Sequence, residues 1–268
     1  MGANIKLLRT RIKSVDSTLH LTKAMGLVAS SKIRKANQAM IKGREYAAAL
    51  KKAVGLLCSS SDCSQSPFLS PYTGEGTTAL VVIAGDRGLA GGYNANIFRL
   101  MREYPEARIF AIGKRACEKY GCPFVSSEKF SLADGVELSK KLCQGFISGE
   151  YKRVGIVSTE YVSMMTQTAK VEWILPLTAG ESSAESGVVF EPDELTILNT
   201  AVSEYVAGLI AVAARESFAC EVAARRMAMD SAGKNAQQMI DDLQLQYNRA
   251  RQGAITQEIT EIVAGSGS

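Results

Sequence analysis

The residues best placed to do chemistry lie in a glycine-rich loop at positions 85–92, Gly-Asp-Arg-Gly-Leu-Ala-Gly-Gly. The loop follows an apolar, β-branched run over 77–84 and precedes a predicted helix, and such loops can hold a phosphate group at a helix N-terminus. However, it matches neither G-x-x-x-x-G-K-[ST] nor G-x-G-x-x-G. Asp86 and Arg87 could equally form a local ion pair that fixes the turn. We favour a structural turn, and a nucleotide-binding α/β enzyme is the alternative.

Metal ligation and nucleophilic catalysis find little support in the sequence. Two cysteine pairs share a C-x4-C spacing, but His20 is the only histidine, and zinc sites usually show tighter cysteine pairs or nearby histidines. The sequence has no G-x-S-x-G motif and no carboxylate cluster. We therefore predict no catalytic residue, no metal and no cofactor. Scattered free thiols are expected at Cys58, Cys63, Cys117, Cys122, Cys143 and Cys220.

Charge is distributed unevenly along the chain. Up to position 52 there are twelve Lys or Arg and two Asp or Glu, a net charge of +10, whereas the whole chain carries +4. This asymmetry predicts an acidic partner or a phosphate backbone for the first segment. A basic coiled-coil protein that binds nucleic acid is therefore a second alternative. Against it, the basic residues surround a continuous apolar seam and are not interleaved with aromatic residues.

That apolar seam repeats in alternating steps of three and four residues, as in a coiled coil, and predicts one helix over residues 1–58. Mid-seam the side chains of Thr22, Gly26 and Ala29 are small, so a partner helix can approach closely there. Gly26 costs about 1 kcal/mol of helix propensity relative to alanine. The sixteen seam positions are Ile5, Leu8, Ile12, Val15, Leu19, Thr22, Gly26, Ala29, Ile33, Ala36, Met40, Gly43, Ala47, Leu50, Val54 and Leu57.

The other end of the chain supplies the partner helix. Residues 216–268 contain no proline and are rich in helix formers. Pro192 is suited to the first turn of a helix. We predict a helix over 191–268 that pairs with the first in a long antiparallel coiled coil. Its packed stripe consists of Val222, Met229, Ala232, Ala236, Ile240, Leu243, Tyr247, Ala250 and Ala254.

Between these two helices the pattern changes to alternating strands and helices. This alternation predicts a Rossmann-like α/β domain with a parallel sheet over residues 77–177, between polar linkers at 59–76 and 178–190. The fold class is therefore α/β, with this domain inserted into the coiled coil. Strands are expected at 77–84, 108–112, 153–159 and 169–177, with a short edge strand within 123–130, and helices at 93–104, 114–120 and 134–149.

Targeting and membrane signals are not evident. No apolar run approaches the ~18–20 residues that would span a bilayer. The N-terminus enters an amphipathic pattern directly, without a signal-peptide core or a transit segment. We expect a cytoplasmic protein, with any membrane association made through a partner.

Several stretches, in order along the chain, resemble the gamma subunit family of bacterial F-type ATP synthases. On the N-terminal side these are residues 22–25 (TKAM) and 28–35 (VASSKIRK), and in the middle 86–94 (DRGLAGGYN). Near the C-terminus they are 221–225 (EVAAR) and 247–252 (YNRARQ). The order of coil, α/β domain and coil is also the plan of that family.

The resemblance implies a non-catalytic rotor in the central stalk. In that family the coiled coil enters a hexamer of alpha and beta subunits, and the lower part binds the epsilon subunit and the membrane ring of c subunits. One copy couples ion flow through the ring to ATP synthesis or hydrolysis on the beta subunits. The implied location is the cytoplasmic face of the bacterial membrane, with membrane contact only through the c ring and no nucleic acid as partner.

Site residues follow from the resemblance by motif position. Phe190 and Glu191, at the foot of the last helix, would approach the c ring or epsilon. Arg225 and Gln252 would donate hydrogen bonds to the alpha/beta crown. The full set of residues implied to face the crown is Lys23, Met25, Arg225, Gln252, Ile255, Thr256, Glu258, Ile259 and Ile262.

Overall fold

The structure, a computed structural model, describes residues 2–69, 76–178 and 190–266. Internal contacts divide the chain into two compact units, Met1–Ser30 with Arg225–Ser268, and Ser31–Ala224. We call the first the coil unit and the second the sheet unit. Two long helices, α1 (Gly2–Cys58) and α5 (Glu194–Ser266), contribute to both.

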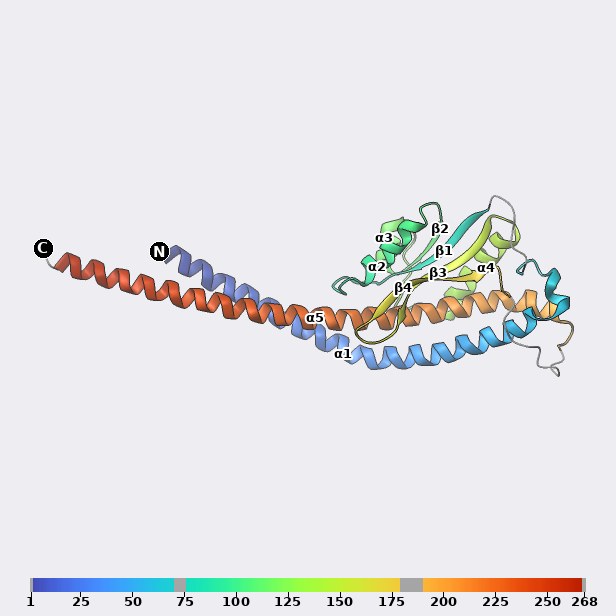
Figure 1. Cartoon of the computed structure of the whole chain (residues 1–268), viewed down its shortest axis with the longest axis horizontal. Coiled ribbons are helices and arrows are strands. Elements are labelled where there is room, and N and C mark those ends of the chain that lie inside the picture. Colours follow the sequence, from blue (N-terminus) through green and yellow to red (C-terminus); the bar gives the residue numbers. More distant parts are fainter. Residues whose placement is uncertain (1, 70–75, 179–189, 267–268) are drawn as a thin grey trace. The chain divides into compact units, whose positions relative to one another are not determined.

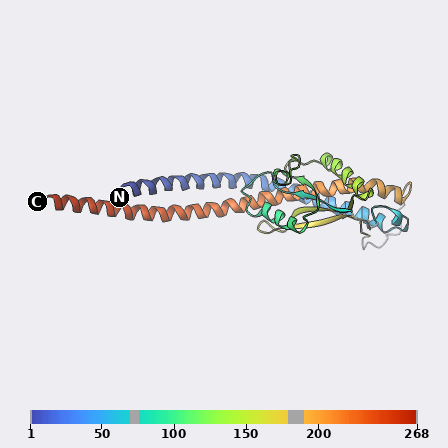
Figure 2. The ribbon, with the colours of Figure 1, turned by 90° about the horizontal axis from the view of Figure 1, so that it is seen from above.

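In the coil unit, α1 and α5 lie side by side in opposite directions (Figures 1 and 2). The predicted seam is confirmed, because all sixteen of its positions along α1 are buried or half-buried, and so are the nine stripe positions of α5. Close approach at the small residues is also confirmed. A Cβ built on Gly26 would lie 3.7 Å from the Cβ of Met229. Arg226 Nη1 donates a hydrogen bond to Gly26 O at 3.4 Å.

The sheet unit contains a four-stranded mixed sheet in the order β2-β1-β3-β4. β1 (Thr77–Ile83) pairs in parallel with β2 (Arg108–Ile112) and β3 (Tyr151–Tyr161), whereas β4 (Gln167–Leu175) pairs antiparallel with β3. The predicted α/β fold is confirmed, but the prediction of a wholly parallel sheet is wrong for β4. Only residues 162–166 join β3 to β4, and a parallel crossover needs about a dozen residues or more.

Helices cover both faces of this sheet (Figure 1). Leu80 and Val82 of β1 point into a core shared with α2 and α3. Val81 and Ile83 point into a second core, shared with α4 and with the sheet-unit parts of α1 and α5. Burial on both faces explains why this strand appears in the sequence as one continuous apolar run. The helix bounds are α2 Tyr93–Leu100, η2 Met101–Glu103, α3 Lys114–Tyr120 and α4 Leu132–Ile147.

The edge strand expected within 123–130 is not formed, so that prediction is wrong. Pro123 has no N–H to donate to a ladder, and the segment bonds to the sheet at one backbone position, where Gly113 N donates to Val125 O at 2.7 Å. The thiols of Cys117 and Cys122 lie 3.6 and 3.9 Å from the carbonyl oxygens of Ala111 and Ile109 on β2. Irregular chain and thiols, rather than a fifth strand, therefore cover this edge.

Part of the first predicted linker is packed into the sheet unit. Within η1 (Ser61–Gln65) and just after it, Cys63 and Phe68 are buried. Ser66 Oγ donates to Asn199 Oδ1 of α5 at 2.8 Å, and Leu177 N donates to Phe68 O at 2.7 Å. The remainder of this linker, 70–75, and 179–189 of the second linker lie outside the described residues.

One stretch of α5 differs from the sequence expectation on membrane spans. An 18-residue window of this helix has a mean hydropathy of 1.6 and is long and apolar enough to cross a bilayer. However, 61% of the window is buried inside the protein. The expectation that no apolar run approaches the length of a membrane span is therefore wrong for this window. Its apolar composition is explained by the burial of α5 in the core of the sheet unit.

Candidate functional site

The glycine-rich loop is a structural turn fixed by the carboxylate of Asp86. This carboxylate accepts hydrogen bonds from Ser126 Oγ at 2.6 Å and from the backbone N–H groups of Lys114 and Ser127, each at 3.0 Å, and Glu128 at 3.2 Å. Burial raises the pKa of Asp86, but these four hydrogen bonds outweigh burial and hold its pKa below the ordinary value. Asp86 therefore joins the ends of β1 and β2 to the segment that follows α3.

The crevice next to this loop is occupied by the protein's own groups. Open α/β sheets bind ligands at the carboxyl ends of the strands where the strand order reverses, here between β1 and β3. Glu221 of α5 is buried there, and a Cβ on Gly85 would lie 2.8 Å from its carboxyl carbon. Gly85 N donates to Asn94 Oδ1 at 2.9 Å. Because the Glu221 carboxyl fills the space beside Gly85 and the Gly85 N–H is already bonded, the arrangement disfavours a bound phosphate group at this position.

Tyr93, the first residue of α2, lies in the same crevice. Burial raises the pKa of its phenol far above the ordinary value, and the carboxylate of Glu221 adds to the rise. The phenol is therefore protonated at physiological pH and is a neutral group in this crevice.

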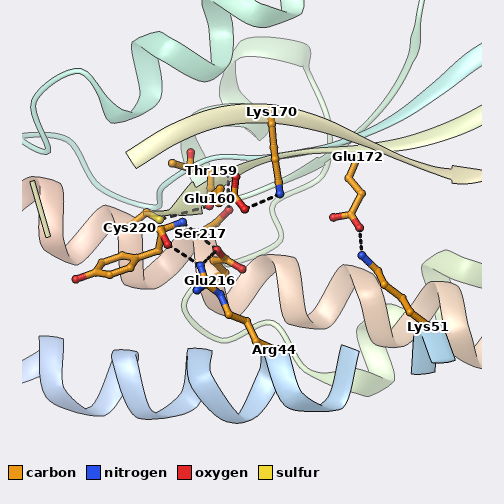
Figure 3. A network of polar contacts seen from close by, with 10 residues as sticks. Arg44, Lys51, Thr159, Glu160, Lys170, Glu172, Glu216, Ser217 and Cys220 are labelled. Atoms are coloured by element: carbon orange, nitrogen blue, oxygen red, sulfur yellow. Dashed lines mark hydrogen bonds and ion pairs between the residues drawn. The ribbon is translucent and has the colours of Figure 1, made fainter. Parts of the chain in front are cut away.

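A polar cluster joins α1, α5 and the end of β3 within the sheet unit (Figure 3). Arg44 Nη2 of α1 donates to Glu216 Oε1 and to Tyr161 O, each at 2.6 Å. The same carboxylate oxygen of Glu216 accepts from Tyr161 N at 2.9 Å. The side chain of Glu216 is only 16% exposed, so this charge-assisted contact is stronger than an ordinary surface ion pair.

Two further side chains of α5 bind the backbone of β3 at Thr159. Thr159 N donates to Ser217 Oγ at 3.2 Å, and Cys220 Sγ donates to Thr159 O at 3.4 Å. Desolvation of the buried Cys220 thiol raises its pKa, and the nearby Glu216 carboxylate raises it further. The thiol therefore stays protonated and acts as a donor. Together with Arg44 and Glu216, these residues form what we call the β3 clamp: Arg44, Glu216, Ser217 and Cys220.

Sequence reasoning missed the β3 clamp. Arg44 was counted only as one of twelve basic residues, and Glu216 only as part of a helical window. The partners are 172 residues apart in the case of Arg44 and Glu216, so no local spacing connects them. The sequence signal is the polar run Arg215-Glu216-Ser217, which comes directly after apolar or small residues at 206–214.

All nine predicted crown-facing residues belong to the coil unit, among them Lys23, Met25 and Arg225. Lys23 is exposed, whereas Met25 and Arg225 are half-buried. Lys23 lines a groove of about 500 Å³ between the two helices, together with Arg226 and Lys234. Asp230, in the same groove, is paired with Lys234 at 2.9 Å. The groove is therefore basic on balance and suits an acidic surface.

The remaining crown-facing residues follow one another along the last turns of α5. Every residue from 255 to 265 is exposed, and Ala254 is the last half-buried position. Ile259 is 56% and Ile262 70% exposed. Gln252, Ile255, Thr256 and Glu258 are also exposed. This end of α5 extends beyond the start of α1 (Figures 1 and 2). A row of exposed isoleucines is typical of a protein–protein interface.

The two residues predicted to meet a c ring or epsilon lie just before α5. Phe190 is half-buried and packs against the core of the sheet unit, whereas Glu191 is exposed. The helix begins at Glu194, later than predicted, and Asp193 caps it by accepting from Thr196 N at 2.8 Å and Thr196 Oγ1 at 2.9 Å. Phe190 therefore has a packing role inside this chain.

Within 2–69, 76–178 and 190–266, no three His, Cys, Asp or Glu side chains are grouped so that they could hold a metal ion. His20 is exposed and lies 3.7 Å from Asp16. The long helix pair with exposed apolar residues at its end, and the α/β domain whose crevice is filled from within, define a structural subunit of a larger assembly.

Comparison with known proteins identifies the family. A family model described as ATP synthase matches residues 4–268. The ATP synthase gamma chain of Ruminococcus albus is 40% identical, over 98% of this chain and 98% of its own length. The sodium ion specific ATP synthase gamma chain of Acetobacterium woodii is 35% identical, over 99% of each chain. The chain therefore belongs to the ATP synthase gamma chain family, which confirms the resemblance seen in the sequence.

Solved structures show the same fold at low sequence identity. A chain of the Euglena gracilis mitochondrial ATP synthase (OSCP/F1/c-ring, rotational state 3) gives a TM-score of 0.67 at 19% identity, covering 98% of this chain and 94% of that one. A chain from the rotor of the same synthase gives 0.63 at 18% identity, covering 95% and 100%. The coiled coil with an inserted α/β domain is thus an architecture found in ATP synthases.

Proposed function

We propose that this chain is the central-stalk rotor subunit of a bacterial F-type ATP synthase. It couples ion flow through a membrane c ring to ATP synthesis or hydrolysis on an alpha/beta hexamer, and it performs no catalysis itself. The observation that carries the proposal is the row of exposed isoleucines on the last turns of α5, in a chain of the ATP synthase gamma chain family. Among the described residues of the coil unit these side chains stay 47–70% exposed, which suits an apolar sleeve in the hexamer.

The mechanism requires that the chain favour different conformations of the catalytic subunits at different angles. A ligand or subunit shifts such an equilibrium only by its difference in binding free energy between states. Burying the exposed part of Ile255, Ile259 or Ile262 contributes on the order of 1 kcal/mol each. The basic groove around Lys23, with Met25 and Arg225 nearby, is suited to acidic loops of the beta subunits, and Gln252, Thr256 and Glu258 supply polar contacts.

The remaining proposed partners are the epsilon subunit and the c ring. The sheet unit and the foot of α5 would bind epsilon and the c ring, with Glu191 exposed for such a contact and Phe190 fixing the local backbone. One copy would serve each complex, on the cytoplasmic face of the cell membrane, with membrane contact only through the c ring. No cofactor and no nucleic acid is required.

Reconstitution tests this function directly. The full chain, mixed with the alpha and beta subunits of the same organism, is expected to give a stable complex with one copy of this chain. Its Mg-ATP hydrolysis should exceed that of alpha and beta alone. If a well-folded chain fails to associate, the rotor proposal is wrong, and retention on DNA that falls steeply with salt would support the nucleic-acid alternative instead.

A truncation tests the proposed bearing residues. Removing residues 252–268 should leave the sheet unit folded, because Ala254 is the only half-buried residue among those described there. In membrane vesicles the truncated chain is expected to seat less firmly and to lower coupled ATP synthesis. Synthesis equal to that of the full chain would contradict the assignment of Gln252 to Ile262 as bearing residues.

A further inference from the structure

Strand β3 extends beyond the end of its neighbour β1. Its pairing with β1 ends at Val157 opposite Val82, whereas its pairing with β4 continues to Tyr161 opposite Gln167. On the side where β1 has ended, the backbone N–H and C=O groups of Thr159 and Tyr161 have no strand to bond. Buried backbone groups of this kind need partners.

The β3 clamp supplies all four partners. Ser217 and Cys220 bind the N–H and C=O of Thr159, while Glu216 and Arg44 bind the N–H and C=O of Tyr161. Three of these side chains come from α5 and one from α1, so the two helices take the place of a strand (Figure 3). Arg44 and Glu216 are also bonded to each other, which ties the two helices together at the same point.

The rest of the contact between the sheet and these helices is mainly apolar. Leu198, Val202 and Ile210 of α5 are fully buried against that face of the sheet. Apolar burial resists separation, but it is non-directional and therefore opposes sliding or twisting weakly. Hydrogen bonds weaken steeply when their distance or angle changes. The polar contacts at the end of β3 therefore fix the register of the helices against the sheet.

We propose that the β3 clamp is the point at which force passes between the α/β domain and the helix pair during rotation. This inference rests on the rotor function proposed above. Arg44 and Glu216 act as positioning residues: they touch no nucleotide, and they hold the helices at a fixed angle to the sheet. A chain without the clamp would still assemble, but it would transmit less of the rotation imposed at the domain.

The test compares coupled and uncoupled activity of the assembled synthase. Complexes carrying Arg44→Met or Glu216→Leu are reconstituted into vesicles, and gradient-driven ATP synthesis is measured beside ATP hydrolysis by the detached catalytic sector. We expect unchanged hydrolysis and roughly fivefold lower synthesis, the lower end of the range for coupling between sites. Ser217→Ala, which leaves the bonds of Arg44 and Glu216 in place, should give a smaller loss in the same direction.

The control is Lys51→Met. Lys51 of α1 also reaches the sheet, through an ion pair with Glu172 of β4, but this pair holds no backbone group (Figure 3). Its removal should leave the ratio of synthesis to hydrolysis at the wild-type value. An equal loss in Lys51→Met would show that any helix-to-sheet ion pair matters, and the clamp would lose its special role.

A charge exchange separates the clamp from a simple ion pair. Arg44→Glu combined with Glu216→Arg should not restore coupling, because a carboxylate would then face Tyr161 O and a guanidinium would face Tyr161 N. Restored coupling would contradict the proposal that the β3 clamp transmits force through its hydrogen bonds to Tyr161. So would wild-type synthesis in Arg44→Met, Glu216→Leu and Ser217→Ala alike. Failure of the wild-type complex to couple synthesis at all would instead contradict the rotor function.

Discussion

The two parts of α5 have different environments although they form one helix. In the sheet unit every residue from 206 to 214 is buried, so the helix is covered over more than two turns on all sides. In the coil unit only one stripe is covered beyond residue 230, and from 255 onward all the described side chains are exposed. The difference shows that the first part of the helix contributes to the core of the fold, whereas the last part presents exposed side chains to which partners can bind. Substitutions in the two parts should therefore have opposite consequences for stability and for assembly.

The largest contrast is expected between two glycines. Gly113 has a φ of +93°, and a Cβ there would lie 1.9 Å from Ala84 O. Gly113→Ala should destabilise the chain by about 4 kcal/mol or more, because both the backbone conformation and the space exclude a side chain. A Cβ on Gly253, at the end of the coil unit, meets nothing within 4 Å, so Gly253→Ala should be neutral or slightly stabilising. Urea unfolding followed by circular dichroism measures both.

Truncation of an isoleucine should separate stability from assembly. Ile210→Ala removes a side chain with 0% exposure and should cost about 3 kcal/mol in unfolding free energy. Ile259→Ala, at 56% exposure, should change stability by less than about 0.5 kcal/mol. In vesicles carrying the assembled synthase, however, Ile259→Ala should lower coupled synthesis. If Ile259→Ala destabilises the free chain as much as Ile210→Ala does, the two parts of α5 do not differ as we argue.

The acid sensitivity of the chain should come partly from the sheet unit. The folded-state pKa of Asp86 is lowered, so its stabilising contribution is present above the ordinary carboxyl pKa of about 4 and is lost as pH falls through the folded value. Asp86→Asn should cost about 1–2 kcal/mol at pH 7 and reduce the dependence of stability on pH below about 5. Asp16→Asn, on the exposed face of α1, is the control. It should change neither the stability at pH 7 nor its dependence on pH.

The smallest expected effect concerns the spacing between α1 and α5, which differs between the coil unit and the sheet unit. Gly26→Ala places a Cβ 3.7 Å from Met229, an ordinary contact, so it should stabilise by about 0.5–1 kcal/mol through helix propensity. Gly208→Ala places a Cβ 2.5 Å from Leu50 Cδ1 and should cost about 1 kcal/mol because Leu50 must move. Equal signs for the two substitutions would show that the helices are spaced alike in both units.

Local periodicity in the sequence was enough to predict the helix pair. All sixteen seam positions of α1, from Ile5 to Leu57, are buried or half-buried, because a repeat of three and four residues maps directly onto one face of a helix. The runs at 77–84, 108–112 and 153–159 are likewise predicted as strands because they are short and apolar, and their apolar residues are buried or half-buried in the structure.

Features that depend on contacts distant in sequence were not predictable in this way. The segment 123–130 is held at the end of β2 by the hydrogen bond from Gly113 N to Val125 O rather than by a strand ladder, and no sequence pattern indicates this bond. The antiparallel direction of β4, by contrast, follows from a local feature, the short connection at 162–166. Arginine and glutamate are common residue types, and nothing in the sequence distinguishes Arg44 and Glu216. Their role arises only because β1 ends before β3 does. The crown-facing positions came from the family resemblance, and their roles stay a prediction.

The unequal lengths of the two helices have a thermodynamic consequence for assembly. The described side chains at 255–265 of α5 are all exposed, and an isolated helix of about a dozen residues is marginal in water. We expect this end to fray in the free chain and to become fully ordered only when other subunits enclose it. Binding must then offset the conformational entropy lost by these residues, so this end of α5 completes its folding as the complex forms.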